Sequence, residues 1–523
     1  MEGRLERGIG KLVAGNILTT AGVRFGDREA FFCSETGRRP TFRQVDERCN
    51  RLANAMIGMG LKKGDVVALL TSNRVEIVEI LFALAKTGIV GMPLNYRLSP
   101  AELFGLMNTV GAQALFCEAR FQEVLDRAPA EVPTLRHRAL FGALAGPGVL
   151  DYEGLLASSS PAEPEIEVEE ADPFYFNLTS GTSGLPKCYT LTHYNNATVT
   201  PMFTSMDVSR HDTFLTVFPM FGRVGYAWIA AGLYFGARNV LGNFDPGRAL
   251  QLIEEERVTI TNLVATMGAM LLQHPDLPKR DLGSLRATVF AGSMLPEPIR
   301  RGVTERICPD IYEYYGMQET GALVVSTPED RKVSPDSVGR VIPHAEVRIV
   351  DDKGRRMPPG EIGEIIGRSP TGTTAYFRNP EKTAETFRNG WIHTGDLGSM
   401  DKEGYLFIRG RKKDMIISGG QNVFAAEIEE AILDCPGVIE CAVVGLPDPL
   451  WGERVSAVVV VEPGSDLTTE QLVRHCRERL ASFKTPKEIL LQSEPLPRTP
   501  TGKVQKFILV ERHGGDATAS ATA

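Results

Sequence analysis

A chain of 523 residues is too long for one ordinary hydrophobic core, so the sequence predicts two or more domains, one of them large. Its 43% apolar and 23% charged residues are typical of a globular protein in water. The 57 basic and 65 acidic residues give a net charge of -8, and no basic block would track a phosphate backbone, which argues against nucleic acid as a partner.

The cysteines and the N-terminal segment indicate the compartment. The eight cysteines are scattered, and none falls in a CxxC pair or near a zinc-like pair of histidines. The N-terminal stretch MEGRLERGIGKLVAG lacks the apolar run of a signal peptide, and no window approaches the roughly 18 apolar residues of a membrane span. We therefore expect a cytoplasmic protein with no integral membrane contact.

Strand-like and helix-like segments alternate through the first half of the chain. GDVVALL (64–70) and IVGMPL (89–94) are strand-like, and residues 74–88 between them form a helix that is apolar on most faces. The same alternation returns over residues 212–266. This pattern predicts parallel sheets covered by helices, whereas residues 126–172, rich in Ala, Pro, Ser and Glu, are expected to be surface connections.

The last third of the chain has a different pattern. Short strands and Gly-rich turns after residue 330 predict a β-rich subdomain, and helices and strands alternate again from about residue 411. The predicted fold class is therefore α/β. It has a large N-terminal domain of helix-covered sheets with a β-rich subdomain (1–410), a small mobile α+β C-terminal domain (411–511) and a disordered tail (512–523).

The stretch TSGTSGLPKC (179–188) has the composition of a phosphate-binding loop. It follows the strand-like segment PFYFNLTS, its glycines allow close approach of a ligand to the backbone, and Lys187 adds a positive charge. An SGTSG string alone is equally typical of a flexible surface turn. The Walker spacing GxxxxGK[ST] is absent, which argues against an ordinary ATPase or kinase switch.

Five ordered motifs identify a resemblance that covers nearly the whole chain. The string TSGTSGLPK followed by LTHYN resembles the signature loop of the adenylate-forming superfamily, which includes acyl-CoA synthetases, aryl-CoA ligases, luciferase and adenylation domains. The other four stretches are YYGMQETGA (314–322), WIHTGDLG (391–398), GRKKDMIISGGQNVFAAEIEEAI (410–432) and LPRTPTGKVQK (496–506).

The resemblance implies two half-reactions. A carboxylate attacks the α-phosphorus of ATP to give an acyl-adenylate and pyrophosphate, and a thiol, usually that of coenzyme A, then displaces AMP. Such chemistry depends on alignment and charge neutralisation more than on covalent catalysis. The resemblance places Glu319 and Thr182 on Mg²⁺, a hard cation that takes oxygen ligands. The implied phosphate loop consists of Thr179, Ser180, Gly181, Thr182, Ser183, Gly184 and Lys187.

For the nucleoside, the resemblance implies that Asp396 accepts hydrogen bonds from the ribose hydroxyls with Arg411 as its partner, although an Asp in a TGD turn is common by itself. Tyr315, beside Gly316, would lie against the adenine ring. The other edge of the adenine would face the backbone of Gly292, Ser293 and Met294.

Lys503 matches the near-C-terminal lysine that bridges the substrate carboxylate and the α-phosphate during adenylation. Because Lys503 belongs to the small domain, it can serve only one half-reaction if that domain rotates, as the resemblance implies. Lys413 stands at the hinge position, and Gly419 and Gly420 match the strip that lines the pantetheine tunnel after rotation.

Three positions depart from the family pattern. Cys188 replaces a glycine and is expected to be a small buried filler, and Gln318 replaces a threonine or serine but still carries an amide donor for the α-phosphate. Gly222-Arg223 stands where many relatives have Phe-His. We expect Arg223 to point outward as a surface charge, with pairing to the second carboxylate of a diacid as the alternative.

The resemblance places the acid substrate against Phe221, Gly222, Arg223, Met267, Gly292 and Gly321. These apolar and glycine-containing walls fit a medium-sized aliphatic, alicyclic or aryl acid better than acetate.

The leading hypothesis is an ATP-dependent acid–CoA ligase that uses Mg²⁺. The alternatives are transfer of the acyl group to a carrier-protein thiol and a non-catalytic sensor of nucleotide or acyl-CoA. The oligomeric state is left open, with a homodimer as one option.

Overall fold

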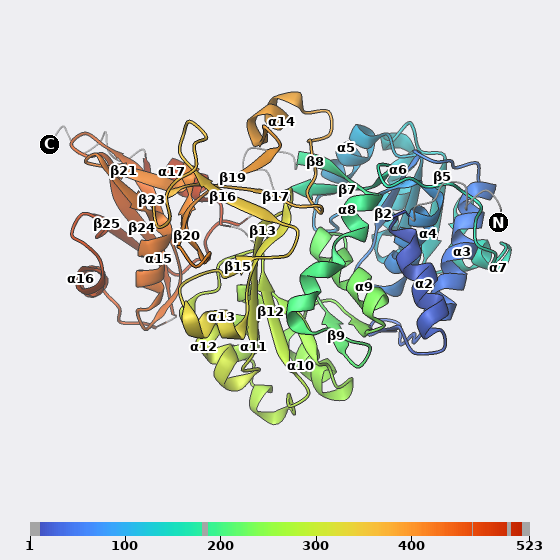
Figure 1. Cartoon of the computed structure of the whole chain (residues 1–523), viewed down its shortest axis with the longest axis horizontal. Coiled ribbons are helices and arrows are strands. Elements are labelled where there is room, and N and C mark those ends of the chain that lie inside the picture. Colours follow the sequence, from blue (N-terminus) through green and yellow to red (C-terminus); the bar gives the residue numbers. More distant parts are fainter. Residues whose placement is uncertain (1–10, 180–186, 463, 499–503, 515–523) are drawn as a thin grey trace.

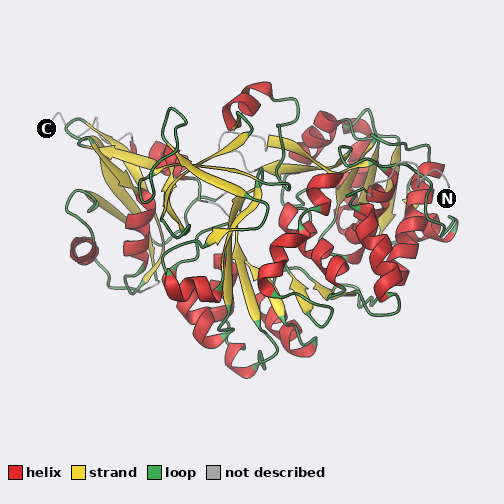
Figure 2. Ribbon diagram, in the orientation of Figure 1, coloured by secondary structure: helices red, strands yellow, loops and turns green. Residues whose placement is uncertain are grey.

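The computed structural model describes residues 11–179, 187–462, 464–498 and 504–514. Figure 1 shows the chain running from a helix-rich region at the N-terminal end, through a second sheet, to a C-terminal region at the opposite end of the molecule. In Figure 2 the strands cross the middle of the molecule, and helices crowd around the N-terminal sheets. The predicted α/β class, with a β-rich part and a small α+β domain, is confirmed.

The first sheet has seven strands in the order β6-β5-β4-β2-β3-β7-β8. All neighbours are parallel except β7 and β8, which are antiparallel and form the two sides of the signature loop. The predicted βαβ unit is confirmed as β2, α4 and β3. The strands are β2 (Val66–Leu70), β3 (Val90–Pro93), β4 (Ala114–Glu118), β5 (His137–Phe141), β6 (Leu150–Asp151), β7 (Pro173–Thr179) and β8 (Lys187–Thr192).

Helix α4 (Val75–Thr87) is buried along its whole length, as its nearly continuous apolar sequence predicts. Its core cluster includes side chains from both N-terminal sheets, so α4 belongs to the layer between them. Its buried Glu79 is neutralised by Arg38 and Arg48. The other elements of this region are α2 (Gly15–Phe25), α3 (Phe42–Gly58), α5 (Pro100–Val110), η1 (Ala119–Phe121), α6 (Gln122–Glu131), α7 (Tyr152–Ala157) and α8 (His193–Ala197).

The second sheet has eight strands in the order β1-β10-β9-β11-β12-β13-β14-β15. The strands run parallel as far as β13, and β14 and β15 add antiparallel edges. The strands are β1 (Phe31–Cys33), β9 (Thr213–Thr216), β10 (Arg238–Leu241), β11 (Ile260–Leu263), β12 (Ala287–Ala291), β13 (Ile311–Met317), β14 (Gly321–Ser326) and β15 (Arg340–Val341). The helices are η2 (Thr200–Met206), α9 (Arg223–Phe235), α10 (Pro246–Glu255), α11 (Ala265–Gln273), η3 (Leu277–Lys279), α12 (Glu297–Arg306) and α13 (Pro328–Val333).

The β-rich subdomain is an antiparallel sheet in the order β16-β17-β19-β18, with β20 paired to β19. It brings Asp396 of β19 opposite Arg411 of β20 in register. The elements are β16 (Glu346–Val350), β17 (Gly363–Arg368), α14 (Pro380–Thr386), β18 (Phe387–Arg388), β19 (Trp391–Met400) and β20 (Leu406–Arg411).

The C-terminal domain contains a sheet in the order β22-β21-β24-β23, with β25 parallel to β24. Its core packs α15 and α16 against the apolar residues of β23 and β24. The elements are η4 (Lys412–Asp414), β21 (Met415–Ser418), β22 (Gln421–Phe424), α15 (Ala425–Leu433), β23 (Val438–Asp448), β24 (Gly452–Val461), α16 (Thr469–Arg479), β25 (Glu488–Gln492) and α17 (Lys506–His513).

The expectation that residues 126–172 are surface connections is wrong in part. This range contains the end of α6 and all of β5, β6 and α7. Ala139 and Leu140 of β5 are buried in the first sheet, and Tyr152 of α7 is fully buried. The segment was missed because β5 begins with the polar pair His137 and Arg138 and is only five residues long.

Among the described residues, no helix has the length and apolar character that crossing a bilayer requires.

Candidate functional site

The signature loop connects the two antiparallel strands β7 and β8. Thr179 and Lys187 are paired across the two strands, so both ends of the loop lie at the same end of the sheet. Five predicted loop residues lie outside the described residues: Ser180, Gly181, Thr182, Ser183 and Gly184. Lys187, which closes the loop, is half-buried and places its ammonium 4.8 Å from the ring centroid of Tyr376.

Tyr376 connects Lys187 to the motif glutamate. Its hydroxyl donates a hydrogen bond of 2.5 Å to Oε1 of Glu319. Burial, together with the neighbouring Glu319 carboxylate, raises the pKa of Tyr376 well above its usual range, so the hydroxyl keeps its proton and remains a donor. Glu319 is only 5% exposed and forms no ion pair with any described side chain.

A buried carboxylate of this kind fits the role that the sequence predicts for it. Mg²⁺ in nucleotide sites is usually bound through one or two carboxylates together with substrate phosphates, so Glu319 is a suitable donor. Within the described ranges, no group of three or more His, Cys, Asp or Glu side chains could hold a metal by itself. A single buried carboxylate is compatible with a cation that is also held by substrate phosphates.

Gln318, one of the three positions that depart from the family pattern, is hydrogen-bonded through both its side chain and its backbone. The Tyr189 hydroxyl donates to its side-chain Oε1 at 3.1 Å, and the backbone carbonyl of Gln318 accepts a hydrogen bond from Arg223 at 2.6 Å. Because the amide oxygen is engaged, its NH₂ group is the end available to a ligand oxygen. The predicted donor capacity of Gln318 is therefore compatible with its contacts.

Cys188 is a buried residue of β8, as expected of a small filler. Its backbone carbonyl accepts a hydrogen bond from the amide of Phe377 at 2.7 Å. Burial raises the pKa of its thiol to about 12, so the reactive thiolate is disfavoured at neutral pH.

The predicted ribose site is assembled across three strands. Asp396 is 7% exposed; its Oδ2 accepts a hydrogen bond of 2.8 Å from the Tyr315 hydroxyl, and its Oδ1 lies 2.7 Å from Nε of Arg411. The Arg411 guanidinium also donates to the backbone carbonyl of Thr394 at 3.2 Å. Burial and the Asp396 carboxylate raise the pKa of Tyr315 well above its usual range. The structure thus brings Tyr315, Asp396 and Arg411 together, as the resemblance implies.

The predicted adenine edge follows β12. Gly292 has a left-handed φ of 86°, Ser293 is exposed, and Met294 is half exposed. Gly316 lies at a bulge in β13, where a Cβ would come within 2.0 Å of the Gly321 carbonyl oxygen. Only glycine fits position 316, which explains the sharp approach of β13 to β14 there.

The residues predicted to face the acid lie at the start of α9, in α11, directly after β12 and at the start of β14. Phe221 packs edge-on against Tyr96, with ring centroids 5.5 Å apart, and Met267 is buried in α11. Gly222 is the N-cap of α9, where a Cβ would make only an ordinary contact. Space rather than backbone strain therefore distinguishes this glycine.

The expectation that Arg223 points outward is wrong. The side chain is buried, at 7% exposure, and its guanidinium donates to the backbone carbonyls of Gln318 and Thr371. Arg223 is the first residue of α9, and its side chain reaches the β13–β14 turn at Gln318 and the segment after β17 at Thr371, where the two carbonyls replace solvent as acceptors. Gly321 makes room for it, since a Cβ there would lie 2.9 Å from Nη2 of Arg223.

The C-terminal residues of the prediction form a separate group. Lys413 is exposed in η4, next to Lys412, which binds Asp352 of the β-rich subdomain. Gly419 and Gly420 form the left-handed turn between β21 and β22, and the Gly419 amide donates to the Trp451 carbonyl at 2.8 Å. In the described part of the chain, no hydrogen bond or ion pair joins this turn to the nucleotide residues, and Lys503 lies outside the described residues.

Sequence reasoning missed three residues that shape the site: Tyr376, Tyr189 and Thr371. Tyr376 and Tyr189 face each other across an isolated antiparallel bridge, which places both phenols beside the Gln318-Glu319 segment. Thr371 contributes a backbone carbonyl, which carries no side-chain signature. The tyrosines occur in stretches of ordinary β-strand composition, so no local signal marked them.

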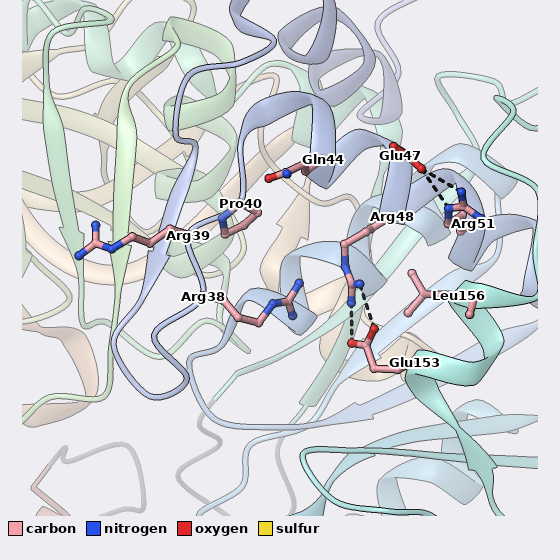
Figure 3. Close-up of a pocket in the computed structure, with 10 residues that line it drawn as sticks. Arg38, Arg39, Pro40, Gln44, Glu47, Arg48, Arg51, Glu153 and Leu156 are labelled. Carbon is pink, nitrogen blue, oxygen red and sulfur yellow. Dashed lines mark hydrogen bonds and ion pairs between the residues drawn. The ribbon is translucent and has the colours of Figure 1, made fainter.

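A hollow of about 490 Å³ elsewhere in the N-terminal domain is not part of this site. Figure 3 shows its lining, in which Arg48 pairs with Glu153 and Arg51 with Glu47. Arg48 also pairs with the buried Glu79, which accepts a hydrogen bond from Tyr152. The arginines are thus neutralised by carboxylates of the chain, which identifies a structural ion-pair network.

Comparisons with known proteins identify the family. The AMP-binding enzyme family matches residues 18–377, and the AMP-binding enzyme C-terminal domain matches residues 427–503. The chain is 37% identical to the indoleacetate–CoA ligase of Aromatoleum aromaticum (89% of this chain, 92% of the relative). It is 33% identical to the long-chain-fatty-acid–CoA ligase FadD13 of Mycobacterium tuberculosis (93% and 95%).

Among solved structures, the anthranilate–CoA ligase AuaEII in complex with anthranoyl-AMP superposes with a TM-score of 0.88 at 29% identity, covering 97% of this chain and 98% of that one. The fold and the two family matches define an adenylate-forming enzyme. The chain belongs to the AMP-binding enzyme family.

Proposed function

We propose that the chain joins a medium-sized aliphatic, alicyclic or aryl carboxylic acid to coenzyme A, with conversion of ATP to AMP and pyrophosphate. ATP-dependent acid–CoA ligation is the activity that the family membership and the CoA-ligase relatives support. The observation that carries the proposal is the trio of Tyr315, Asp396 and Arg411 beside the separate buried carboxylate of Glu319.

In the first half-reaction, Asp396 would accept hydrogen bonds from the ribose hydroxyls and hold the nucleoside. Lys187 and the signature loop would neutralise the β- and γ-phosphates, and Gln318 would donate its amide to the α-phosphate. Glu319, with Thr182, would hold Mg²⁺, which when bound reduces the negative charge on the phosphate chain. The acid carboxylate then attacks the α-phosphorus, and pyrophosphate leaves.

In the second half-reaction, the small domain would rotate about Lys413 so that Lys503 leaves the reaction centre. Gly419 and Gly420 would then line the path of the pantetheine thiol, which attacks the acyl carbon and releases AMP. This rearrangement is part of the proposal, because the Lys413 hinge and the Gly419-Gly420 strip are carried over from the family motifs.

The inward position of Arg223 affects which class of acid the site could accept. Its two terminal nitrogens are engaged by backbone carbonyls, which weighs against a diacid whose second carboxylate would need them. Phe221, Gly222 and Met267 would then surround the acid mostly with apolar groups. Such a pocket separates acids that differ by one methylene only modestly, by about 1–3 kcal/mol.

The test is release of AMP and pyrophosphate by the purified protein with ATP and Mg²⁺. The acids would be short, medium and long aliphatic, alicyclic, aryl and dicarboxylic, each with and without CoA. CoA-dependent AMP formation with a medium-sized monoacid is expected. AMP formation that needs a carrier-protein thiol would change the acceptor, and ATP binding without either product across the panel would favour a sensor.

Two further predictions stay open to experiment. We expect a cytoplasmic location, which fractionation of the source cells would test. Sedimentation would distinguish a monomer from a homodimer.

A further inference from the structure

Arg223 is a buried cation with neutral partners. Only 7% of it is exposed, and no carboxylate in the described part of the chain forms an ion pair with it. Nη1 donates to the Gln318 carbonyl at 2.6 Å, and Nη2 donates to the Thr371 carbonyl. Burying a guanidinium without a counter-charge is costly, so its hydrogen bonds to these two carbonyls must be maintained for the fold to tolerate it.

The two carbonyls belong to segments that meet at the motif glutamate. One segment is Gln318 to Gly321, which contains Glu319. The other is residues 369–373, where the Thr373 amide donates to the Glu319 carbonyl at 2.8 Å and the Thr371 hydroxyl donates to the Thr320 carbonyl at 3.1 Å. Arg223 therefore connects both segments to the first turn of α9.

The segment around Thr371 is fixed from its other side as well. The Asn195 amide of α8 donates to the carbonyls of Pro370 at 2.8 Å and Gly372 at 2.9 Å. Because Asn195 and Arg223 bind three successive carbonyls, residues 370–372 have little freedom to move. The Glu319 backbone is in turn attached to Thr373, at the end of this fixed stretch.

Tyr189 adds a side-chain contact to the same network. Its hydroxyl donates to Oε1 of Gln318 at 3.1 Å. Burial raises the pKa of Tyr189 well above its usual range, although the nearby Arg223 acts in the opposite direction, so the phenol remains a neutral donor. Arg223 thus fixes the backbone of Gln318, and Tyr189 fixes its amide.

We propose that Arg223 is a positioning residue for adenylation, a role that rests on the proposed function. By holding the carbonyls of Gln318 and Thr371, it keeps the Gln318 amide and the Glu319 carboxylate in the orientation that ATP and its metal require. Tyr189 acts with it. Since Gly222, on the acid side, immediately precedes Arg223, the same residue connects the acid pocket to the ATP site.

The planar guanidinium explains why this position requires arginine. Two nitrogens separated by a rigid fork can reach two carbonyls on different segments at once. A lysine carries one point charge on a flexible stem, so it would hold one segment well and the other poorly. Methionine would fill the volume without binding either carbonyl.

The test compares Arg223→Met, Arg223→Lys and Tyr189→Phe with the wild type in the full chain. Arg48→Met is the control, because Arg48 is a half-buried arginine of the N-terminal domain outside this site, and Arg38 and Tyr152 still satisfy Glu79 in its absence. Acid-dependent exchange between ATP and pyrophosphate gives kcat and the KM of each substrate. Equilibrium binding of ATP and amide hydrogen exchange over residues 317–321 are measured separately.

We expect Arg223→Met to lower the kcat of exchange by at least about 10-fold with little change in the KM of the acid. Arg223→Lys should recover part of the loss. Exchange of the amides at 317–321 should become faster by at least about 10-fold in Arg223→Met and remain unchanged in Arg48→Met. Combining Arg223→Met with Tyr189→Phe should cost less than the sum of the two, because both hold the same residue.

Two results would overturn the proposal. One is an Arg223→Met protein whose kcat and amide exchange at 317–321 match the wild type. The other is a loss confined to the KM of the acid, which would place Arg223 on the substrate. If the wild type forms no adenylate, the proposed function fails, while the amide exchange of Arg223→Met still decides whether Arg223 fixes this segment.

Discussion

The nucleotide side and the acid side of the site use different kinds of partner. On the proposed nucleotide side, carboxylates meet side-chain donors from other segments: Asp396 meets Tyr315 and Arg411, and Glu319 meets Tyr376. On the proposed acid side, Arg223 is the one charged side chain among the predicted substrate residues, and its partners within the described ranges are backbone carbonyls and a phenol. The proposed nucleotide side thus presents carboxylate side chains to a ligand. The proposed acid side presents mostly apolar side chains and glycines, so the space between them would select the acid.

This difference agrees with the different acids that the relatives carry in their names, from indoleacetate to long-chain fatty acids. A surface of apolar side chains and glycines can be altered one methyl group at a time, at a cost of a few kcal/mol. A carboxylate that binds a ribose or a metal cannot be substituted in such small steps, because its replacement removes a charged hydrogen-bond acceptor.

The largest expected effect is on the nucleotide side. Glu319→Gln keeps the size of the side chain and an acceptor for the Tyr376 hydroxyl but removes the charge. We expect acid-dependent pyrophosphate exchange to fall about 100-fold or more, because a charged ligand to the phosphate-bound metal is lost. Initial rates over a range of Mg²⁺ concentrations measure it.

The control for this change is Glu313→Gln on β13, the strand that precedes Glu319. Glu313 is also buried, but its partner is Arg331, 3.0 Å away. It should lose stability and keep its exchange rate once the folded fraction is taken into account. Equal losses in both variants would mean that Glu319 has no special role.

The next effect concerns the ribose. Asp396→Asn should raise the KM for ATP by about 10-fold or more, because hydrogen bonds to a charged acceptor contribute about 1.5–3 kcal/mol. The variant should also lose most of the preference of the wild type for ATP over 2′-deoxy-ATP. Exchange kinetics with both nucleotides measure the change.

Asp330 provides a matched control, since it is a buried aspartate with its own tyrosine and arginine. Tyr405 donates to it at 3.4 Å, and Arg340 lies 2.7 Å from it. Asp330→Asn should leave the nucleotide preference intact. A preference that survives in Asp396→Asn would remove Asp396 from the ribose site.

A smaller effect separates two glycines of the acid side. Both Gly292 and Gly321 have left-handed φ angles, of 86° and 71°. A Cβ at Gly321 would lie 2.3 Å from the Thr371 hydroxyl and 2.9 Å from Arg223, whereas at Gly292 the nearest atom is 3.9 Å away. Gly292→Ala should cost about 1 kcal/mol of unfolding free energy from its backbone alone, and Gly321→Ala should cost more. Denaturant unfolding compares them, and equal costs would contradict the crowding around Arg223.

The smallest expected effect concerns His193, whose ring lies 5.1 Å from that of Phe174. Neither ring nitrogen has a partner among the described residues, and burial lowers the pKa of His193 to about 4. The unfolded chain therefore binds more protons below pH 6.5, so stability should fall as the pH drops from about 6.5 to 4. Relative to His193→Gln, the loss should approach about 1.4 kcal/mol per pH unit. Melting temperatures of both proteins at pH 6.5 and 4.5 test this, and parallel losses would exclude His193 as the cause.

How far the sequence predicts the site depends on the type of contact. Asp396 and Arg411 could be paired from their motifs, and the structure places them opposite each other on β19 and β20. Arg223 could not be placed, because its acceptors are backbone carbonyls 95 and 148 residues away, and a carbonyl leaves no trace in the sequence. Thr371 was missed for the same reason, because it contacts Arg223 through its backbone carbonyl.

The fold also shows that local sequence predicts some elements and misses others. Strongly apolar segments such as α4 were predicted with nearly correct ends, because burial dominates their sequence. Strand β5 was missed because its neighbours in the sheet, and not its own composition, make it a strand. The strand conformation of β5 therefore depends on its pairing with β4 and β6, which the local sequence does not reveal.

The central claim is that these residues build a site where a carboxylate is adenylated. The most direct measurement is mass spectrometry of the wild-type protein after incubation with ATP, Mg²⁺ and an acid, without CoA. The account predicts a bound acyl-adenylate, with one pyrophosphate released for each adenylate formed. Formation of ADP and phosphate in place of an adenylate would contradict it.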